Sequence, residues 1–197
     1  MISKLELLEY SIDYFTKFGS KSFTMDELAN KLGISKKTIY YYFNNKEELV
    51  TEGLCFILEK IKQQMDEVIS NENDPILKVI LIYEIGFSYL NSFKPSFIFG
   101  LKKYYPKANA VFEAFRDDVV NHKVRNLLEE AQRKKIIQQD VKIDLMCELY
   151  FLQVENIAFK QNNLFEKYAT DVLLKHLIVN NLRGIVTTGY SNRIFER

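Results

Sequence analysis

Glycine and proline are scarce in this chain, which has seven glycines and three prolines among 197 residues. Because both residues interrupt regular helices, their scarcity argues for long helices. Apolar residues make up 47% of the sequence, which is enough for one or two compact domains with a substantial core. The composition therefore predicts an all-α fold.

Cysteine and histidine are also rare, which limits the chemistry available to the chain. Cys55 and Cys147 lie far apart in apolar helical runs, so we expect free, buried thiols in a reducing compartment. His122 and His176 are isolated, and no cluster of Cys, His or Asp has the spacing of metal ligands, so we expect no metal and no cofactor. The sequence has no glycine-rich phosphate loop, no nucleophile elbow and no histidine paired with a plausible nucleophile, which argues against an enzyme.

Net charge is almost absent, at +1, and residues 1 to 50 carry seven lysines against seven acidic residues. Binding of nucleic acid would therefore depend on a local basic patch, which argues against a nonspecific chromatin-like protein. The amino terminus mixes Glu6, Glu9 and Asp13 among its apolar residues. This mixture is typical of neither a signal peptide nor a membrane span, so we expect a cytoplasmic protein without membrane contact.

A stretch near the amino terminus carries the start and stop signals of two short helices. Thr24 and Glu27 have the spacing of a capping box, and Gly33 can end the first helix in the left-handed conformation. Ser35 is the expected N-cap of a second helix, Lys36–Tyr42. Two helices joined by a tight glycine-containing turn form a helix-turn-helix, whose second helix can enter a major groove of DNA.

The charges around the second helix favour contact with DNA. From Leu28 to Lys46 the chain has four lysines and no acidic residue, so a phosphate would meet no repulsion from this stretch. Lys36, Lys37 and Thr38 lie in the first turn and are the best placed to reach base edges. The other candidate DNA contacts offer hydroxyl groups or positive charge to phosphates: Thr24, Ser35, Tyr40, Tyr41, Tyr42 and Lys46. The alternative interpretation of the whole helix is a solvated surface hairpin, but three adjacent tyrosines rarely serve solubility. For Tyr40 alone, a further alternative is a place partly in the core.

These residues form a linked pattern that resembles the TetR family of one-component bacterial regulators. The pattern consists of Phe23-Thr24-Met25, Leu28-Ala29, Gly33-Ile34-Ser35, Thr38-Ile39-Tyr40, Tyr42-Phe43 and Lys46-Glu47-Glu48-Leu49. The resemblance implies a three-helix DNA-binding head, residues 1–47, and a helical ligand-binding and dimerisation body, residues 48–197. It also implies repression that a small molecule releases. The chain departs from the family at Lys37, where many members have glycine, and this departure affects how bases would be read.

Periodic apolar residues predict further long helices beyond the motif. One would run from Asn45 to Ser70 and link the head to the body, and the others are expected at Pro75–Phe93, Pro95–Tyr105, Lys107–Ile136, Ile143–Phe159 and Tyr168–Val186. The last two helices have little polar surface, so we expect a second chain to cover them. The resemblance agrees, since it implies a four-helix bundle across a two-fold axis and hence a homodimer.

Candidate ligand contacts are aromatic and polar residues within the apolar helices: Tyr83, Phe87, Tyr104, Phe112, His122, Phe151, Glu155 and Phe159. Glu155 is a lone carboxylate in an apolar run and needs a cationic partner, a place at the dimer seam or a polar ligand. The alternative for each residue is a packing or surface role. For the whole chain, the alternatives are a lipid- or small-molecule-binding protein of the same fold without DNA binding, and a DNA-binding protein without an effector.

Overall fold

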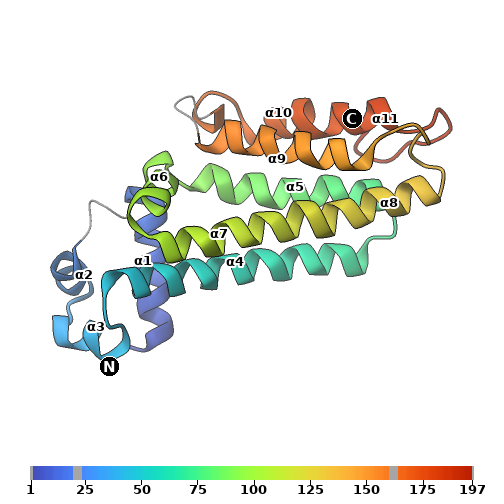
Figure 1. Ribbon diagram of the computed structural model, residues 1–197. Helices are drawn as coiled ribbons and strands as arrows, with labels where there is room; N and C mark the ends of the chain where they lie inside the picture. Colours follow the sequence, from blue (N-terminus) through green and yellow to red (C-terminus); the bar gives the residue numbers. More distant parts are fainter. Residues whose placement is uncertain (1, 20–23, 160–163, 197) are drawn as a thin grey trace. The chain divides into compact units, whose positions relative to one another are not determined.

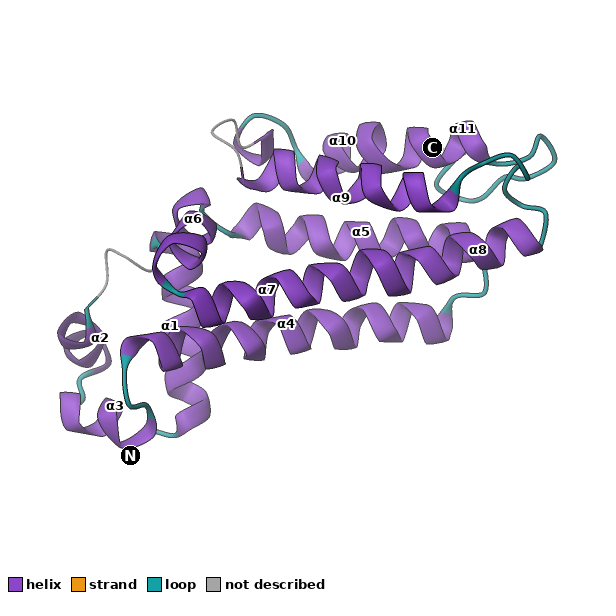
Figure 2. Ribbon diagram, viewed as in Figure 1, coloured by secondary structure: helices purple, strands orange, loops and turns teal. Residues whose placement is uncertain are grey.

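The computed structural model describes residues 2–19, 24–159 and 164–196, and these residues form helices and no strand (Figures 1 and 2). The all-α prediction is confirmed. The chain divides into two compact units. The first contains Met1–Lys60 and Ser92–Phe115, and the second contains Ile61–Asn91 and Arg116–Arg197. The division into a head of residues 1–47 and a body of residues 48–197 stays a prediction.

The first unit contains the helix-turn-helix and the segments that support it. Its helices are α1 (Lys4–Phe18), α2 (Met25–Leu32), α3 (Lys36–Tyr42), the first part of α4 (Lys46–Asn71), α6 (Pro95–Tyr104) and most of α7 (Pro106–Asp117). Apolar side chains from several of these helices are fully buried, among them Leu7, Phe15, Leu28, Ile39, Leu49 and Phe97. Helix α6 is joined to the end of α1, because the Lys94 N–H donates to the Thr16 carbonyl at 2.8 Å.

The second unit contains the end of α4, α5 (Pro75–Ser92), α9 (Ile143–Phe159) and several shorter segments. These are η1 (Asp118–Val124), α8 (Arg125–Arg133), η2 (Leu164–Glu166), α10 (Thr170–Leu174), η3 (Lys175–Val179) and α11 (Asn180–Ile185). The carboxy-terminal tail folds back onto the turn between α4 and α5, where the Tyr190 hydroxyl donates to Asp74 Oδ2 at 2.6 Å. None of the described helices is by itself long and apolar enough to span a bilayer.

Helix starts agree with the capping signals of the sequence, with one difference. Asp74 Oδ1 accepts from the N–H groups of Ile76 and Leu77, as expected for the cap of α5. At the start of α4, Asn45 Oδ1 accepts from the Glu48 N–H at 2.9 Å. The Glu48 carboxylate, however, accepts from the Asn44 N–H at 2.5 Å, one residue earlier than a capping box requires.

Two predictions of burial are wrong. His122 continues the spacing of Phe115 and Val119 along the predicted helix, which predicts an inward side chain, but this side chain is 64% exposed and lies 3.6 Å from the Asp118 carboxylate. The seven-residue π-helix η1 interrupts the predicted helix Lys107–Ile136. Because a π-helix has a wider turn, it changes which residues face inward, and Val119, Val120 and Val124 are buried instead. Cys55 is exposed rather than buried, whereas Cys147 is buried as expected.

Candidate nucleic-acid interface

The helix-turn-helix is built by local capping. Thr24 Oγ1 accepts from the Glu27 N–H at 3.1 Å, and Glu27 Oε2 accepts from the Thr24 N–H at 2.7 Å. Gly33 ends α2 with φ 63° and ψ 30°, the left-handed conformation that glycine adopts at low cost. Phe23, the first residue of the sequence pattern, lies outside the described residues. The capping residues therefore set the direction in which α3 leaves the turn.

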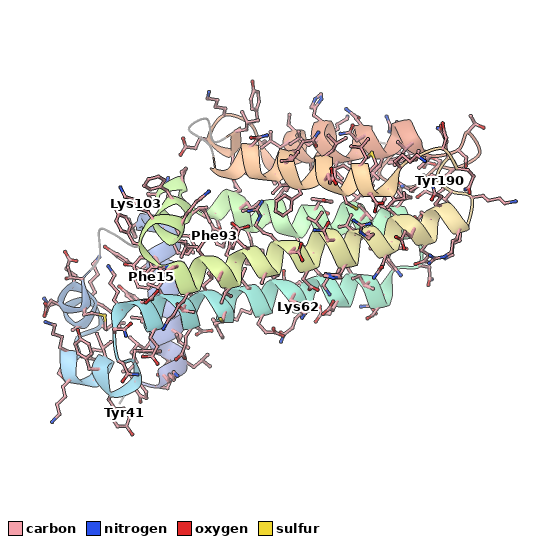
Figure 3. The ribbon with its side chains drawn as sticks, viewed as in Figure 1. Phe15, Tyr41, Lys62, Phe93, Lys103 and Tyr190 are labelled. Carbon is pink, nitrogen blue, oxygen red and sulfur yellow. The ribbon has the colours of Figure 1, made fainter. Side chains whose placement is uncertain are left out.

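Helix α3 has one face in the core and one face in solvent. Ile39 and Phe43 are buried, which fixes the rotation of the helix about its axis. Lys36 and Lys37 are exposed at its start, and the Tyr41 side chain is 80% exposed and projects from the end of the helix (Figure 3). Basic and hydroxyl-bearing side chains thus lie together on the outward face, as the sequence predicted.

Several hydroxyl groups of this region already have partners within the protein. The Ser35 and Thr38 hydroxyls lie 2.9 Å apart, and Ser35 Oγ also accepts from the Thr38 N–H. The Tyr42 hydroxyl donates to the Ile2 carbonyl at 3.1 Å, and Thr24 Oγ1 donates to its capping partner Glu27. Tyr40, in contrast, is 47% exposed, and the exposed Tyr41 ring packs edge-on against the Tyr42 ring. Tyr40 and Tyr41 are therefore the tyrosines best placed to reach a phosphate.

The lysines of the interface differ in their surroundings, which spacing along the sequence did not indicate. Lys36 Nζ lies 2.8 Å from Asp26 Oδ1 of α2, and this hydrogen bond raises the pKa of the lysine. Lys37 has no ion-pair partner among the residues that the structure describes. Lys46 is half-buried, its Nζ lies 5.9 Å from the centre of the Tyr105 ring, and burial lowers its pKa. Lys37 is therefore the lysine most available to DNA.

The candidate ligand contacts fall into both compact units. In the second unit Tyr83 and Phe87 are buried together, with ring centres 6.1 Å apart. Phe151, on α9, is half-buried beneath the Arg116 guanidinium, whose carbon lies 4.3 Å from the ring centre. Tyr150 lies 5.5 Å from Tyr83, ring centre to ring centre, and was missed by the sequence reasoning. Tyr150 follows Cys147, which was expected to be buried, by three residues in the apolar run of α9, and this spacing was the signal that could have indicated it.

The remaining candidates do not join this cluster. Phe112 is buried in the first unit, and Tyr104, in the same unit, is 39% exposed beside Lys103. His122 faces solvent. Glu155 and Phe159 belong to α9, but their side chains lie outside the described ones. No group of three or more metal-binding side chains occurs among the residues that the structure describes.

Comparison with known proteins connects this geometry to a family. Residues 7–52 match the family described as "Bacterial regulatory proteins, tetR family". The uncharacterized HTH-type transcriptional regulator YvaF of Bacillus subtilis is 26% identical over 168 residues, which cover 83% of this chain and 86% of that protein. The regulator YhgD of the same organism is 44% identical over 61 residues, 31% of this chain and 32% of YhgD.

A solved structure extends the similarity to the whole fold. FadR of Bacillus subtilis, solved in complex with stearoyl-CoA, has a TM-score of 0.74 at 16% identity, over 93% of this chain and all of FadR. At this identity the likeness establishes the shared fold. The matched segment contains α2, α3 and the start of α4, which are the elements that build the exposed face of α3. Residues 7–52 therefore carry the signature of the TetR family, and the chain is similar along most of its length to HTH-type transcriptional regulators.

Proposed function

We propose that this chain is a transcriptional regulator of the TetR family, a cytoplasmic, homodimeric repressor that leaves its operator when a small molecule binds. The observation that carries the proposal is the outward face of α3, where Lys36 and Lys37 are exposed at the start of the helix and Tyr41 at its end. Lysine side chains in the first turn can donate to guanine acceptors in the major groove, and tyrosine hydroxyls can donate to phosphates.

Two copies of α3 would contact successive major grooves of a two-fold operator. In this geometry the half-site centres lie about 34–36 Å apart, one turn of duplex DNA. Each exposed lysine that pairs with a phosphate releases counterions, so it steepens the salt dependence of binding by about one unit.

The homodimer is supported by an uncovered apolar face in the second unit. Leu145, Leu149 and Leu152 recur along α9 at spacings of four and three, and their exposed fractions are 53%, 42% and 53%. Tyr168, just before α10, and Val172, within α10, are 54% and 40% exposed. An exposed leucine row of this kind is typical of a protein–protein contact, and a second copy of this chain would cover it.

The release mechanism is supported by helix α4, which belongs to both units as one continuous helix. Lys46–Lys60 lies in the unit that contains α3, and Ile61–Asn71 lies in the other. A ligand that alters the packing of the second unit can therefore change the position of α3 through α4. The coupling free energy between two such sites is typically about 1–3 kcal/mol. The similarity to FadR, solved with stearoyl-CoA, favours an effector with a large apolar part.

DNA contact is tested by replacing Lys36 and Lys37 with glutamine and measuring fluorescence anisotropy on an operator selected from the source genome. We expect weaker binding and a salt dependence that is flatter by about one unit for each phosphate that no longer pairs with a lysine. The matched control replaces Lys102 and Lys103, which are exposed on α6 of the same unit, with glutamine. Equally weakened binding in both variants would indicate bulk charge rather than a specific DNA-binding surface. Unchanged binding by the Lys36/Lys37 variant would show that DNA binds another surface, whereas a wild-type protein that selects no fragment from the genome would favour a ligand-binding protein that does not bind DNA.

The dimer is tested by Leu149→Glu, followed by light scattering after gel filtration. A charge in the leucine row should convert the dimer to a monomer and abolish cooperative binding to a two-fold operator. Leu5→Glu is the matched control, since Leu5 is 52% exposed on α1 and outside the leucine row. If the Leu149→Glu variant remained a dimer, the leucine row would not be the dimer interface.

Release of the protein from DNA is tested by adding stearoyl-CoA to the protein–operator complex and measuring operator affinity by fluorescence anisotropy. A shift of about 1–3 kcal/mol corresponds to an affinity that is roughly 5- to 150-fold weaker. An affinity that no acyl-CoA and no fraction of a cell extract changes would support a regulator that binds DNA without an effector.

A further inference from the structure

Helix α9 places polar groups where apolar ones are expected and leucines where polar ones are expected. Its exposed face carries Leu145, Leu149 and Leu152. Its interior face carries Cys147 and Tyr150, which are 0% and 1% exposed, and Gln153, whose Oε1 is buried. A buried polar group is informative because burial removes it from water, and folding therefore favours apolar side chains at such positions.

Three polar atoms of this region have no hydrogen-bond partner among the described residues. They are the hydroxyl oxygens of Tyr83 and Tyr150 and the amide oxygen of Gln153. Buried polar side-chain atoms in folded proteins are nearly always hydrogen-bonded, so each exception calls for a partner such as water or a ligand. Tyr83 is 5% exposed and Tyr150 is 1% exposed, so bulk solvent does not reach their rings.

The three groups lie close together in the second unit. The Tyr83 ring, on α5, lies 5.5 Å from the Tyr150 ring, on α9, at an angle of 63°. Gln153 follows Tyr150 by three residues, so the two side chains are neighbours on the helix surface. Phe87 lies 6.1 Å from Tyr83, and Phe165 lies 5.5 Å from Phe87, all between ring centres. Unpaired polar atoms are thus bordered by aromatic rings.

The chemistry of these groups defines a ligand. Burial raises the pKa of both Tyr83 and Tyr150, so both remain neutral phenols that can donate hydrogen bonds. The Gln153 oxygen can only accept. Two donors and one acceptor match an uncharged hydroxyl group, which accepts two hydrogen bonds and donates one.

We propose that Tyr83, Tyr150 and Gln153 bind the hydroxyl group of an uncharged, largely apolar molecule, whose apolar part lies against Phe87 and Phe165. This inference rests on the proposed function, because the bound molecule is the effector. The aromatic rings contact one another in the present structure, so the ligand has to separate α5 from α9 to enter. Binding thereby rearranges the packing of the second unit, which is the change that release from DNA requires.

The experiment compares wild-type protein with a Tyr83→Phe/Tyr150→Phe double variant. Tyr168→Phe is the matched control, because it removes a hydroxyl from a tyrosine that is 54% exposed. The probes are straight-chain alcohols from butan-1-ol to dodecan-1-ol, with 1-methoxydecane as an analogue that cannot donate a hydrogen bond. Binding is measured by isothermal calorimetry, and thermal unfolding is measured without probe.

We expect the double variant without probe to unfold about 2–4 °C higher than wild type, because it no longer buries two unpaired hydroxyls. We expect at least one alcohol to bind wild type and the Tyr168 control, and to bind the double variant about tenfold more weakly. The ether should bind wild type more weakly than the alcohol of similar length.

Three results would overturn the inference. One is a lower unfolding temperature of the double variant, which would mean that buried water satisfies the hydroxyls. The others are equal affinity of the double variant and wild type for the alcohols, and no binding of any alcohol to wild type. The operator assay separates this failure from failure of the proposed function. If the alcohol that binds wild type most tightly releases DNA from wild type and from the double variant equally, the repressor mechanism stands and the hydroxyl site does not.

Discussion

The ion pair between Lys36 and Asp26 gives a sharp test of how α3 binds DNA. Lys36 Nζ lies 2.8 Å from Asp26 Oδ1, with 47% and 66% of the two side chains exposed. When Lys36 moves to a phosphate, this pair has to break, and the Asp26 carboxylate then lies near the negatively charged DNA backbone. Asp26→Asn removes both penalties, so we expect the variant to bind the operator more tightly than wild type.

The magnitude follows from the exposure of the pair. Solvent screens an ion pair between exposed side chains, so losing the pair changes affinity by only roughly 1.4- to 5-fold for one protomer. Since a dimer breaks two such pairs, the expected increase in affinity is about 2- to 30-fold. The salt dependence should also steepen, by up to about one unit per protomer, because Lys36 is no longer neutralised before binding.

Operator affinity is measured by anisotropy at several salt concentrations. The matched control is Asp13→Asn, which removes the same charge from an exposed pair with Lys17, 2.7 Å apart on α1. Asp26 also lies in the first turn of α2, where a carboxylate stabilises the helix by about 0.3–1 kcal/mol, so thermal unfolding is measured in parallel. An affinity that does not rise, or that rises equally in both variants, would refute the reasoning.

Three further predictions concern the folded state. Gly33→Ala should destabilise the protein by about 1 kcal/mol in urea unfolding, because alanine is strained at the φ of 63°. The added Cβ would meet no atom within 4 Å, so no crowding is expected, and a destabilisation of several kcal/mol would contradict this. Tyr190→Phe should lower the free energy of unfolding in urea by about 1.5–3 kcal/mol, because the Tyr190 hydroxyl donates to the Asp74 carboxylate. An unchanged free energy of unfolding would mean that this hydrogen bond does not hold the carboxy-terminal tail in place. The N–H groups of Asp74 and Asn73 lower the pKa of Glu72 below its ordinary value of 4.5. Glu72 therefore stabilises the fold above pH 4.5, and this contribution should disappear as the pH falls through the lowered pKa; a Glu72→Gln variant should lack this pH dependence.

Local signals in the sequence determined the helix-turn-helix almost residue by residue. Thr24, Gly33 and Ser35 act through hydrogen bonds and backbone angles that span a few positions, so their roles could be inferred without knowing what packs nearby. The helix Lys36–Tyr42 was predicted with its observed bounds for the same reason. The apolar face of α9 was also foreseen, since a helix with little polar surface needs cover wherever it lies.

Other features depended on contacts between residues far apart in the chain. The pairing of Lys36 with Asp26 needs the angle between α2 and α3, and the exposure of His122 needs the π-helix that changes the helical phase. The rings of Tyr83 and Tyr150, whose hydroxyls are unpaired, lie side by side only because α5 packs against α9. The sequence by itself determined where helices start, end and bury an apolar face, because those rules act over one or two turns. Only the tertiary structure decided which polar groups lie next to one another, because that depends on packing between distant segments.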